Sequence, residues 1–178
     1  VALPYFLNEN KELVNIISNS IPKGTILITG ALMRLKKEDD KQIYNSLYVL
    51  KDYEISQIYN KLKLVPFGEF IPFRNYIPIK KITYGTHDFS SGSSRKNIFL
   101  NTKSGSFYFE PSICFEGIFP KKRISDVNPF FLVNITNDAW FGSTTGPSQH
   151  LAISRLRAVE RGSPLIRVAN SGISAIFD

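Results

Sequence analysis

The sequence predicts an α/β domain, and three of its properties support this prediction. First, apolar stretches rich in branched residues alternate with stretches of helical periodicity along the 178 residues. Second, hydrophobic residues make up 43% of the chain and charged residues 21%, a composition typical of globular proteins with a buried core. Third, neither an internal repeat nor a linker divides the chain, so residues 1–178 are expected to form a single domain.

The first third of the chain is expected to contain one helix and three strands. The helix is predicted over residues 8–20, where apolar residues recur with the helical period and Asn8 or Asn10 is suited to cap the start. The strands are predicted over Thr25–Leu32, Tyr44–Leu50 and Glu54–Tyr59, with a charged hairpin tip at Lys36–Lys41. Pro66–Asn97 is rich in proline and glycine, which predicts a long irregular segment.

Alternating elements are expected again after residue 97. Strands are predicted over Ile98–Asn101, Ser106–Glu110, Phe130–Ile135, Leu165–Ala169 and Ile173–Phe177. Helices are predicted over Phe115–Ile124 and Ser148–Arg161, and a polar loop over Thr136–Gly146. Cys114 is therefore expected between a strand and a helix.

The charge and the short motifs narrow the classes of partner. The net charge of +7 favours anionic partners, although lysine-rich surfaces that are merely solvated explain it equally well. The basic clusters are short and scattered, so no nucleic-acid partner is expected. His87 and His150 lack metal-ligand spacing, and no phosphate-binding or dinucleotide motif is present, so no cofactor is expected. No apolar run reaches the ~18–20 residues that span a bilayer.

Cys114 is the strongest candidate for a chemical role. A thiol at the end of a strand and the start of a helix is well placed for nucleophilic attack, because amides at the helix start stabilise a thiolate or an oxyanion. The alternative is that this lone cysteine packs in the core. Glu116 lies two residues later, and a carboxylate so close to a thiol opposes thiolate formation unless it is itself paired. Glu116 therefore fits a positioning role better than the role of a base.

Lys61, Glu69 and two loop aromatics are weaker candidates when each is considered alone. Lys61 precedes the irregular segment, and a lysine there is able to stabilise a developing oxyanion beside a carboxylate such as Glu69. The alternative is a solvated surface lysine. Trp140 and Phe141 lie in the polar loop, where aromatic side chains either contact a ligand or anchor the loop to the core.

Together, these positions resemble the motifs of the nitrilase superfamily of carbon–nitrogen hydrolases. Leu64–Glu69, after Lys61, resembles the lysine motif of that superfamily, and Ser112–Glu116 resembles its nucleophile motif. Asn134–Gly142 and Pro164–Ser174 resemble the apolipoprotein N-acyltransferase branch in particular. The resemblance covers nearly the whole chain, and several ordered motifs are far more specific than any one of them.

This resemblance implies a nitrilase-type αββα sandwich, truncated at both ends, with a Glu–Lys–Cys triad. It implies that Cys114 takes a fatty acyl chain from a phospholipid as a thioester, which the N-terminal amine of a diacylated apolipoprotein then attacks. Lys61 matches the catalytic lysine of the family. Glu69, Glu116 and Phe115 match positions that support the site.

The resemblance also implies a membrane setting. Flanking membrane helices, which this chain lacks, would place the protein in a bacterial inner membrane with this domain on the periplasmic side. Trp140 and Phe141 are predicted to bind substrate. The irregular segment is predicted to be the most mobile part of the chain. Its lipid-facing residues are predicted to be Phe67, Phe70, Phe73, Arg74, Tyr76, Lys80, Lys81 and Tyr84.

Two departures from the family pattern leave other functions open. The base glutamate of the family would lie one position before Val1, and Phe115 replaces the tyrosine usual in this branch. Residues 1–178 alone are therefore predicted to be inactive in acyl transfer. A soluble nitrilase-type amidase is one alternative, although Thr136–Gly142 argues against it. A non-catalytic remnant of a split gene is the other alternative.

Overall fold

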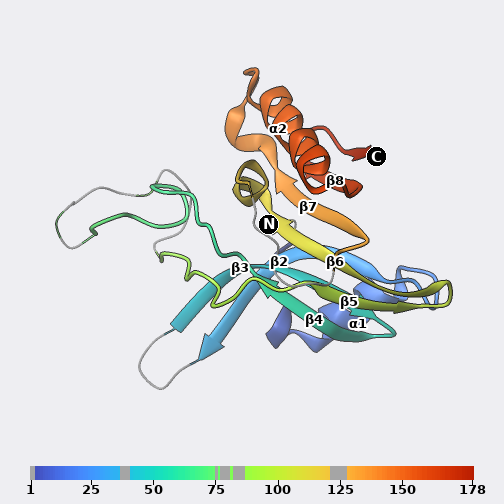
Figure 1. Cartoon of the computed structure of the whole chain (residues 1–178). Coiled ribbons are helices and arrows are strands. Elements are labelled where there is room, and N and C mark those ends of the chain that lie inside the picture. Colours follow the sequence, from blue (N-terminus) through green and yellow to red (C-terminus); the bar gives the residue numbers. More distant parts are fainter. Residues whose placement is uncertain (1–2, 37–40, 75, 77–80, 82–86, 121–127) are drawn as a thin grey trace. The chain divides into compact units, whose positions relative to one another are not determined.

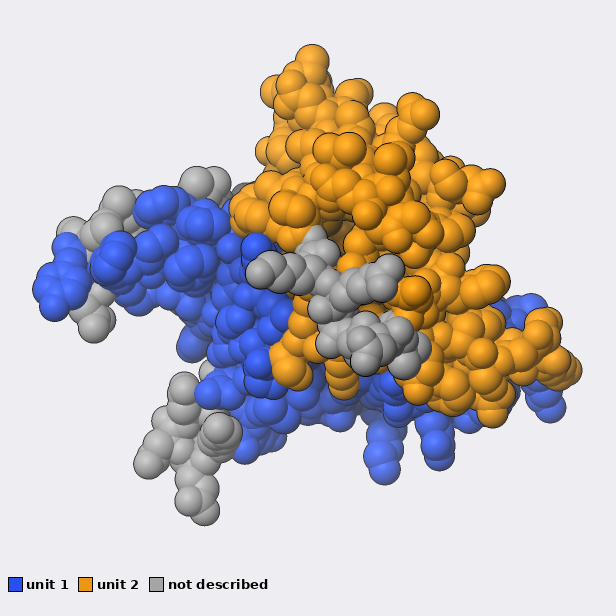
Figure 2. All heavy atoms as spheres, in the orientation of Figure 1, with its two compact units in different colours: residues 1, 3–93 blue, residues 2, 94–178 orange. Residues whose placement is uncertain are grey.

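The computed structural model describes residues 3–36, 41–74, 76, 81, 87–120 and 128–178 (Figure 1). Within them the chain forms two compact units, Leu3–Ser93 and Ser94–Asp178, which Figure 2 shows in different colours. In its described residues each unit contains one β-sheet, with four strands in the first and five in the second. These mixed sheets with few helices confirm the α/β class, while the single domain expected over residues 1–178 stays a prediction.

The first unit is built on a sheet with the strand order β1-β2-β3-β4. Its strands are β1 (Leu3–Phe6), β2 (Leu27–Lys36), β3 (Lys41–Lys51) and β4 (Glu54–Asn60). β1 runs parallel to β2, and the other neighbouring strands are antiparallel. The three predicted strands are confirmed, and β1 is an additional strand that the sequence patterns do not predict. The predicted hairpin tip falls mainly on residues 37–40, outside the described residues.

The helix α1 (Lys11–Asn19) packs against this sheet and follows the 3₁₀ turn η1 (Leu7–Glu9). The predicted helix and one of its two predicted caps are confirmed, because the Asn10 side chain accepts a hydrogen bond from the Leu13 amide at 2.9 Å. The buried core of this unit consists of Leu7, Val14, Ala31, Tyr48 and Leu50. Burying a large apolar side chain of this kind contributes about 1.5–3 kcal/mol.

The segment after β4 is irregular throughout its described residues, as predicted, apart from one isolated bridge. It returns to the sheet at Gly92, whose amide donates to the Lys61 carbonyl at 2.8 Å. A Cβ atom at Gly92 would lie 2.4 Å from the Asn60 carbonyl oxygen, so this close approach requires glycine. Among the described residues of the segment, the exposed aromatics are Phe67, Phe73 and Tyr76. Its predicted mobility and lipid contact stay predictions, and Lys80 and Tyr84 lie outside the described residues.

An ion pair between Arg74 and Asp88 joins two described parts of this segment. Arg74 Nε donates to Asp88 Oδ2 at 2.7 Å, and this pairing holds the pKa of Asp88 below its ordinary value. Replacing Arg74 with alanine is therefore expected to raise the pKa of Asp88 toward that value. The stability that this pair contributes is present above the ordinary pKa and is lost as pH falls through the lowered pKa. An NMR titration of the Asp88 carboxyl in both proteins measures the shift, and an unchanged pKa would contradict the pairing.

The second unit is built on a sheet with the strand order β5-β6-β7-β8-β9. Its strands are β5 (Ile98–Thr102), β6 (Gly105–Ile113), β7 (Phe131–Asn137), β8 (Leu165–Asn170) and β9 (Ala175–Phe177). All five predicted strands are confirmed. β6, β7 and β8 are parallel, so their carboxyl ends at Ile113, Asn137 and Asn170 lie along one edge of the sheet. Functional side chains of α/β proteins gather at this kind of edge.

The helix α2 (Gly146–Arg161) confirms the second predicted helix and packs along β8 (Figure 1). It ends at Gly162, whose left-handed conformation is typical of a helix C-terminus. On its buried side, Ala158 packs with Leu132 of β7 and Leu165 of β8. Among the described residues, no helix has both the length and the apolar character needed to cross a membrane.

The helix predicted over Phe115–Ile124 is wrong in its described part. Only a 3₁₀ turn, η2 (Cys114–Ile118), follows β6, and Phe119 is extended with φ −89° and ψ 135°. The physical reason is Pro120, whose ring disfavours a helical conformation in the residue before it. A second 3₁₀ turn, η3 (Asp138–Phe141), lies within the predicted polar loop.

Candidate active site

Lys61 forms a buried ion pair with Glu69 in the first unit. The two side chains have exposed fractions of 1% and 4%, and Lys61 Nζ lies 2.7 Å from Glu69 Oε2. The solvated surface lysine considered as an alternative is therefore wrong. Because a buried charge without a partner is strongly unfavourable, the pairing explains how both groups tolerate burial. The sequence motif that contains both residues thus corresponds to a direct contact.

A tight turn brings Glu69 back to Lys61. The turn is closed by the Glu69 amide, which donates to the Val65 carbonyl at 2.8 Å. The Glu69 carboxylate in turn accepts hydrogen bonds from the Val65 amide at 2.8 Å and from Asn45 Nδ2 at 2.9 Å. These contacts fix the carboxylate on three sides, so Glu69 orients Lys61 rather than acting as a free base. The backbone of Lys61 is also held in place, because its amide donates a hydrogen bond to the Asn45 carbonyl at 2.9 Å.

Cys114 lies directly after the last residue of β6, as predicted, and its side chain is half-buried. Its φ angle of +49° is in the left-handed region, which costs about 1–2 kcal/mol for a residue with a side chain. Strain of this kind clusters at functional sites. The conformation turns the chain sharply between β6 and η2, so the thiol lies at the edge where the parallel strands end.

Glu116 is buried and stabilises this turn. Its carboxylate accepts a hydrogen bond from the Ile113 amide at 2.8 Å, and its exposed fraction is 2%. This contact supports the positioning role expected for Glu116. Phe115 packs edge-on against Phe119, with ring centroids 4.9 Å apart.

Trp140 and Phe141 project from η3 with exposed fractions of 47% and 38%. Phe141 is partly held in place, because its ring lies close to Gly146 and 5.9 Å from the His150 ring. Trp140 is therefore the freer of the two aromatics, and substrate binding by either stays a prediction. Among the described residues, no group of three or more histidine, cysteine or acidic side chains is placed to hold a metal ion.

The structure thus brings the predicted site residues together in two groups, one in each unit. The first contains Lys61 and Glu69, and the second contains Cys114, Phe115 and Glu116. The approach of Lys61 to a ligand on Cys114 stays a prediction.

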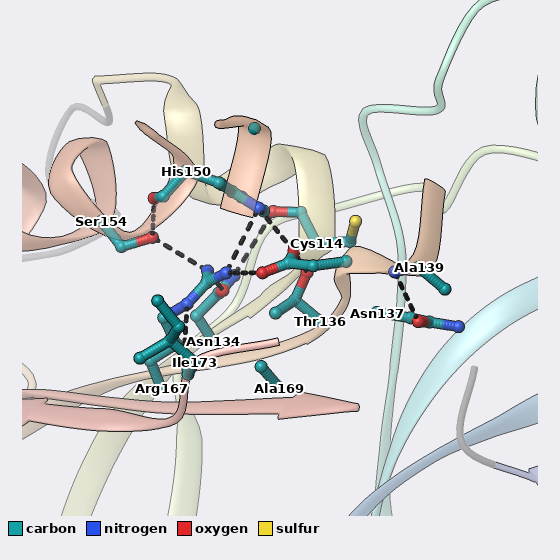
Figure 3. Close-up of polar contacts among 12 residues, drawn as sticks. Cys114, Asn134, Thr136, Asn137, Ala139, His150, Ser154, Arg167, Ala169 and Ile173 are labelled. Atoms are coloured by element: carbon teal, nitrogen blue, oxygen red, sulfur yellow. Dashed lines mark hydrogen bonds and ion pairs between the residues drawn. The ribbon is translucent and has the colours of Figure 1, made fainter. Parts of the chain in front are cut away.

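Sequence reasoning missed a third group, which lies beside Cys114 in the second unit (Figure 3). Its members are Asn134, Asp138, His150, Ser154 and Arg167, all buried and joined by hydrogen bonds. One signal was present in the sequence: Arg167 stands in the otherwise apolar stretch Leu165–Ala169, and a buried arginine requires a partner.

The chain belongs to the carbon-nitrogen hydrolase family, whose pattern matches residues 4–178. It is similar to the apolipoprotein N-acyltransferase of Rhodopseudomonas palustris, with 40% identity over 99% of this chain and 34% of the relative. The apolipoprotein N-acyltransferase of Rickettsia typhi is 42% identical over 94% of this chain and 33% of the relative. The chain therefore spans about a third of the length of the curated relatives that it matches.

Solved structures agree with the family assignment at the level of the fold. A glutamine-dependent NAD+ synthetase from Acinetobacter baumannii is similar over 98% of this chain and 31% of its own, with a TM-score of 0.65 and 17% identity. A CN-hydrolase superfamily protein from Xanthomonas campestris is similar over 85% of this chain and 54% of its own, with a TM-score of 0.53 and 17% identity. These likenesses confirm the nitrilase-type fold class expected from the sequence.

Proposed function

We propose that this chain is the catalytic part of an apolipoprotein N-acyltransferase. The observation that carries the proposal is the similarity to apolipoprotein N-acyltransferases of about 40% identity, which extends over 94–99% of this chain. The buried Lys61–Glu69 pair and the strained turn at Cys114 support it, because each falls within a motif on which the resemblance rests. The donor is a phospholipid, and the acceptor is the N-terminal amine of a diacylated apolipoprotein.

In the first step, the Cys114 thiolate attacks the ester carbonyl carbon of the phospholipid. A tetrahedral intermediate forms, its C–O bond breaks, and a lysophospholipid leaves with the proton that a general base took from the thiol. In the second step, the acceptor amine attacks the thioester. The C–S bond breaks, an amide forms, and the amine proton passes to the base while the Cys114 thiolate is regenerated. The resemblance assigns the base to a glutamate before Val1.

The remaining site residues stabilise the tetrahedral intermediates or hold the catalytic groups in place. Lys61 supplies a positive charge for the oxyanion of both tetrahedral intermediates, a role worth about 3–4 kcal/mol per donor in acyl-transfer enzymes. Glu69 keeps Lys61 in place through the 2.7 Å contact. Glu116 keeps the turn at Cys114 in place through its bond to the Ile113 amide.

The membrane setting is part of the same proposal. Trp140 and Phe141, exposed on η3, and the exposed aromatics of the irregular segment offer apolar surface for acyl chains. Arg74 and Lys81 lie in the same segment and suit lipid phosphate. The catalytic part faces the periplasm, beside a bacterial inner membrane.

A nitrilase-type amidase and a non-catalytic remnant are the competing functions. The purified full-length protein separates all three when it is incubated with a phospholipid that carries a labelled acyl chain. A transferase places the label on Cys114 in a hydroxylamine-sensitive bond and then passes it to a diacylglyceryl-cysteine peptide. An amidase instead releases ammonia from small amides, and a remnant does neither. Absence of label on Cys114 and on the peptide would remove the proposed function.

A further inference from the structure

We propose that the buried group around Arg167 positions Cys114 for catalysis, an inference that rests on the proposed function. The Arg167 network is defined as Asn134, Asp138, His150, Ser154 and Arg167. Its members come from β7, η3, α2 and β8. Figure 3 shows the polar ends of Asn134, His150, Ser154 and Arg167 converging beside Cys114. The network therefore ties the turn that carries the nucleophile to four other elements of the same unit.

Arg167 is the centre of the network, and its side chain has an exposed fraction of 0%. Its Nη2 lies 2.7 Å from Asp138 Oδ2, which supplies the opposite charge. Its Nη1 donates to Asn134 Oδ1 at 2.9 Å and to Ser154 Oγ at 3.0 Å, and its Nε donates to the Ile173 carbonyl at 3.3 Å. A planar guanidinium with these partners has one allowed orientation, so Asn134 is oriented as well.

Asn134 connects Arg167 to the turn that contains Cys114. With its Oδ1 engaged by Arg167, the amide must point its Nδ2 the other way. Nδ2 donates to Ser112 Oγ at 3.0 Å and makes a longer contact of 3.4 Å with the Cys114 carbonyl oxygen. Asn134 thereby contacts the residues on both sides of Ile113, and this contact supports the left-handed conformation of Cys114.

His150 holds the Asp138 carboxylate of the network in place. Its Nδ1 lies 2.9 Å from Asp138 Oδ1, which also accepts a hydrogen bond from Thr136 Oγ1 at 3.2 Å. Asp138 therefore has contacts on both oxygens and cannot turn away from Arg167. His150 Nε2 is buried without a hydrogen-bond partner among the described residues, so the histidine is held through Nδ1.

Two glycines allow the backbone to approach the network closely. A Cβ atom at Gly172 would lie 2.5 Å from Asp138 Oδ2, and one at Gly117 would lie 2.9 Å from Asn134 Nδ2. Real Cβ contacts are essentially never shorter than 3.0 Å, so the backbone approaches both polar groups as closely as glycine permits. Gly117 belongs to η2, the same turn that begins with Cys114. A methyl group at either position would displace the network without removing any of its charges.

The isosteric change Asn134→Asp tests the inference in the full-length protein. An aspartate keeps the acceptor for Arg167 but loses the donor to Ser112 and Cys114. The expected result is a fall in kcat of roughly 10–100-fold with little change in KM, because misplacing a reacting group by about 1 Å costs up to ~10²-fold. Amide hydrogen exchange at residues 112–118 is expected to become faster. Asn101→Asp, the same change at an exposed asparagine of β5, should alter neither quantity.

A second variant covers the case in which Asn134→Asp does not fold. Gly172→Ala removes no polar group but displaces Asp138, and it is expected to lower kcat in the same way. Wild-type kcat in a folded variant of either kind would overturn the positioning role. If the wild-type protein itself transfers no acyl chain, the proposed function fails, and hydrogen exchange at residues 112–118 still decides whether the network positions the turn.

Discussion

Replacing Cys114 with serine is expected to abolish acyl transfer while the fold is retained. The hydroxyl of serine is a far weaker acid than a thiol, so the carboxylate base proposed for this mechanism, which suffices for a thiol, does not activate it. Glu69 and Glu116, the carboxylates within the two motifs, are committed to hydrogen bonds with Val65 and Ile113. The expected loss is at least ~10⁴-fold in kcat, the scale observed when an acyl-transfer nucleophile is removed.

The measurement is transfer of a labelled acyl chain to a diacylglyceryl-cysteine peptide, together with thermal unfolding of both proteins. Because serine differs from cysteine by one atom at a half-buried position, the unfolding temperature should change little. Serine also forms an oxygen ester that resists hydroxylamine at neutral pH, so any residual acylation can be assigned to the correct atom. A serine variant that acylates the peptide at a rate near that of the wild type would remove Cys114 from the mechanism.

The sequence predicted the regular elements well because their patterns are local. β6, β7 and β8 were expected from local strand patterns, and Cys114 was expected between the strand that ends near Glu110 and a following helix. The helix predicted after Cys114 was wrong because the prediction gave more weight to apolar content than to the proline that follows. Pro120 prevents the preceding residue from continuing a helix, and Phe119 is extended as a result.

The site was only partly predictable because its contacts are not local. Considered alone, a lysine such as Lys61 is expected at the surface. Its burial depends on Glu69, which lies eight residues later and is brought back to Lys61 by a turn of the chain. The resemblance to a family supplied this pair, whereas composition and periodicity did not. Arg167 was overlooked because its partners come from other elements, and Asn134 and Asp138 lie 33 and 29 residues away in the sequence.

Replacing Lys61 with methionine is expected to destabilise the protein by about 3–5 kcal/mol, because Glu69 then keeps a buried charge without its partner. The control is Lys103→Met, which removes an exposed lysine from the turn between β5 and β6 and should change the free energy of unfolding by less than ~0.5 kcal/mol. Chemical denaturation of the two variants gives both values. Similar values for the two changes would show that the Lys61–Glu69 pair contributes no net stability.

The double variant Lys61→Met/Glu69→Gln separates this structural role from catalysis. Glutamine at position 69 still accepts from the Val65 amide through its oxygen, and its amide nitrogen has a ready acceptor. That acceptor is Asn45 Oδ1, which is buried and has no hydrogen-bond partner among the described residues. The Asn45 amide turns over to present it, because Asn45 Nδ2 is the atom that faces Glu69 in the wild type. Most of the stability lost in Lys61→Met should therefore return in the double variant, a favourable coupling of the kind measured by double-mutant cycles. Acyl transfer should not return, because no positive charge is left to stabilise the oxyanion, and a stable double variant with wild-type transfer would exclude Lys61 from the chemistry.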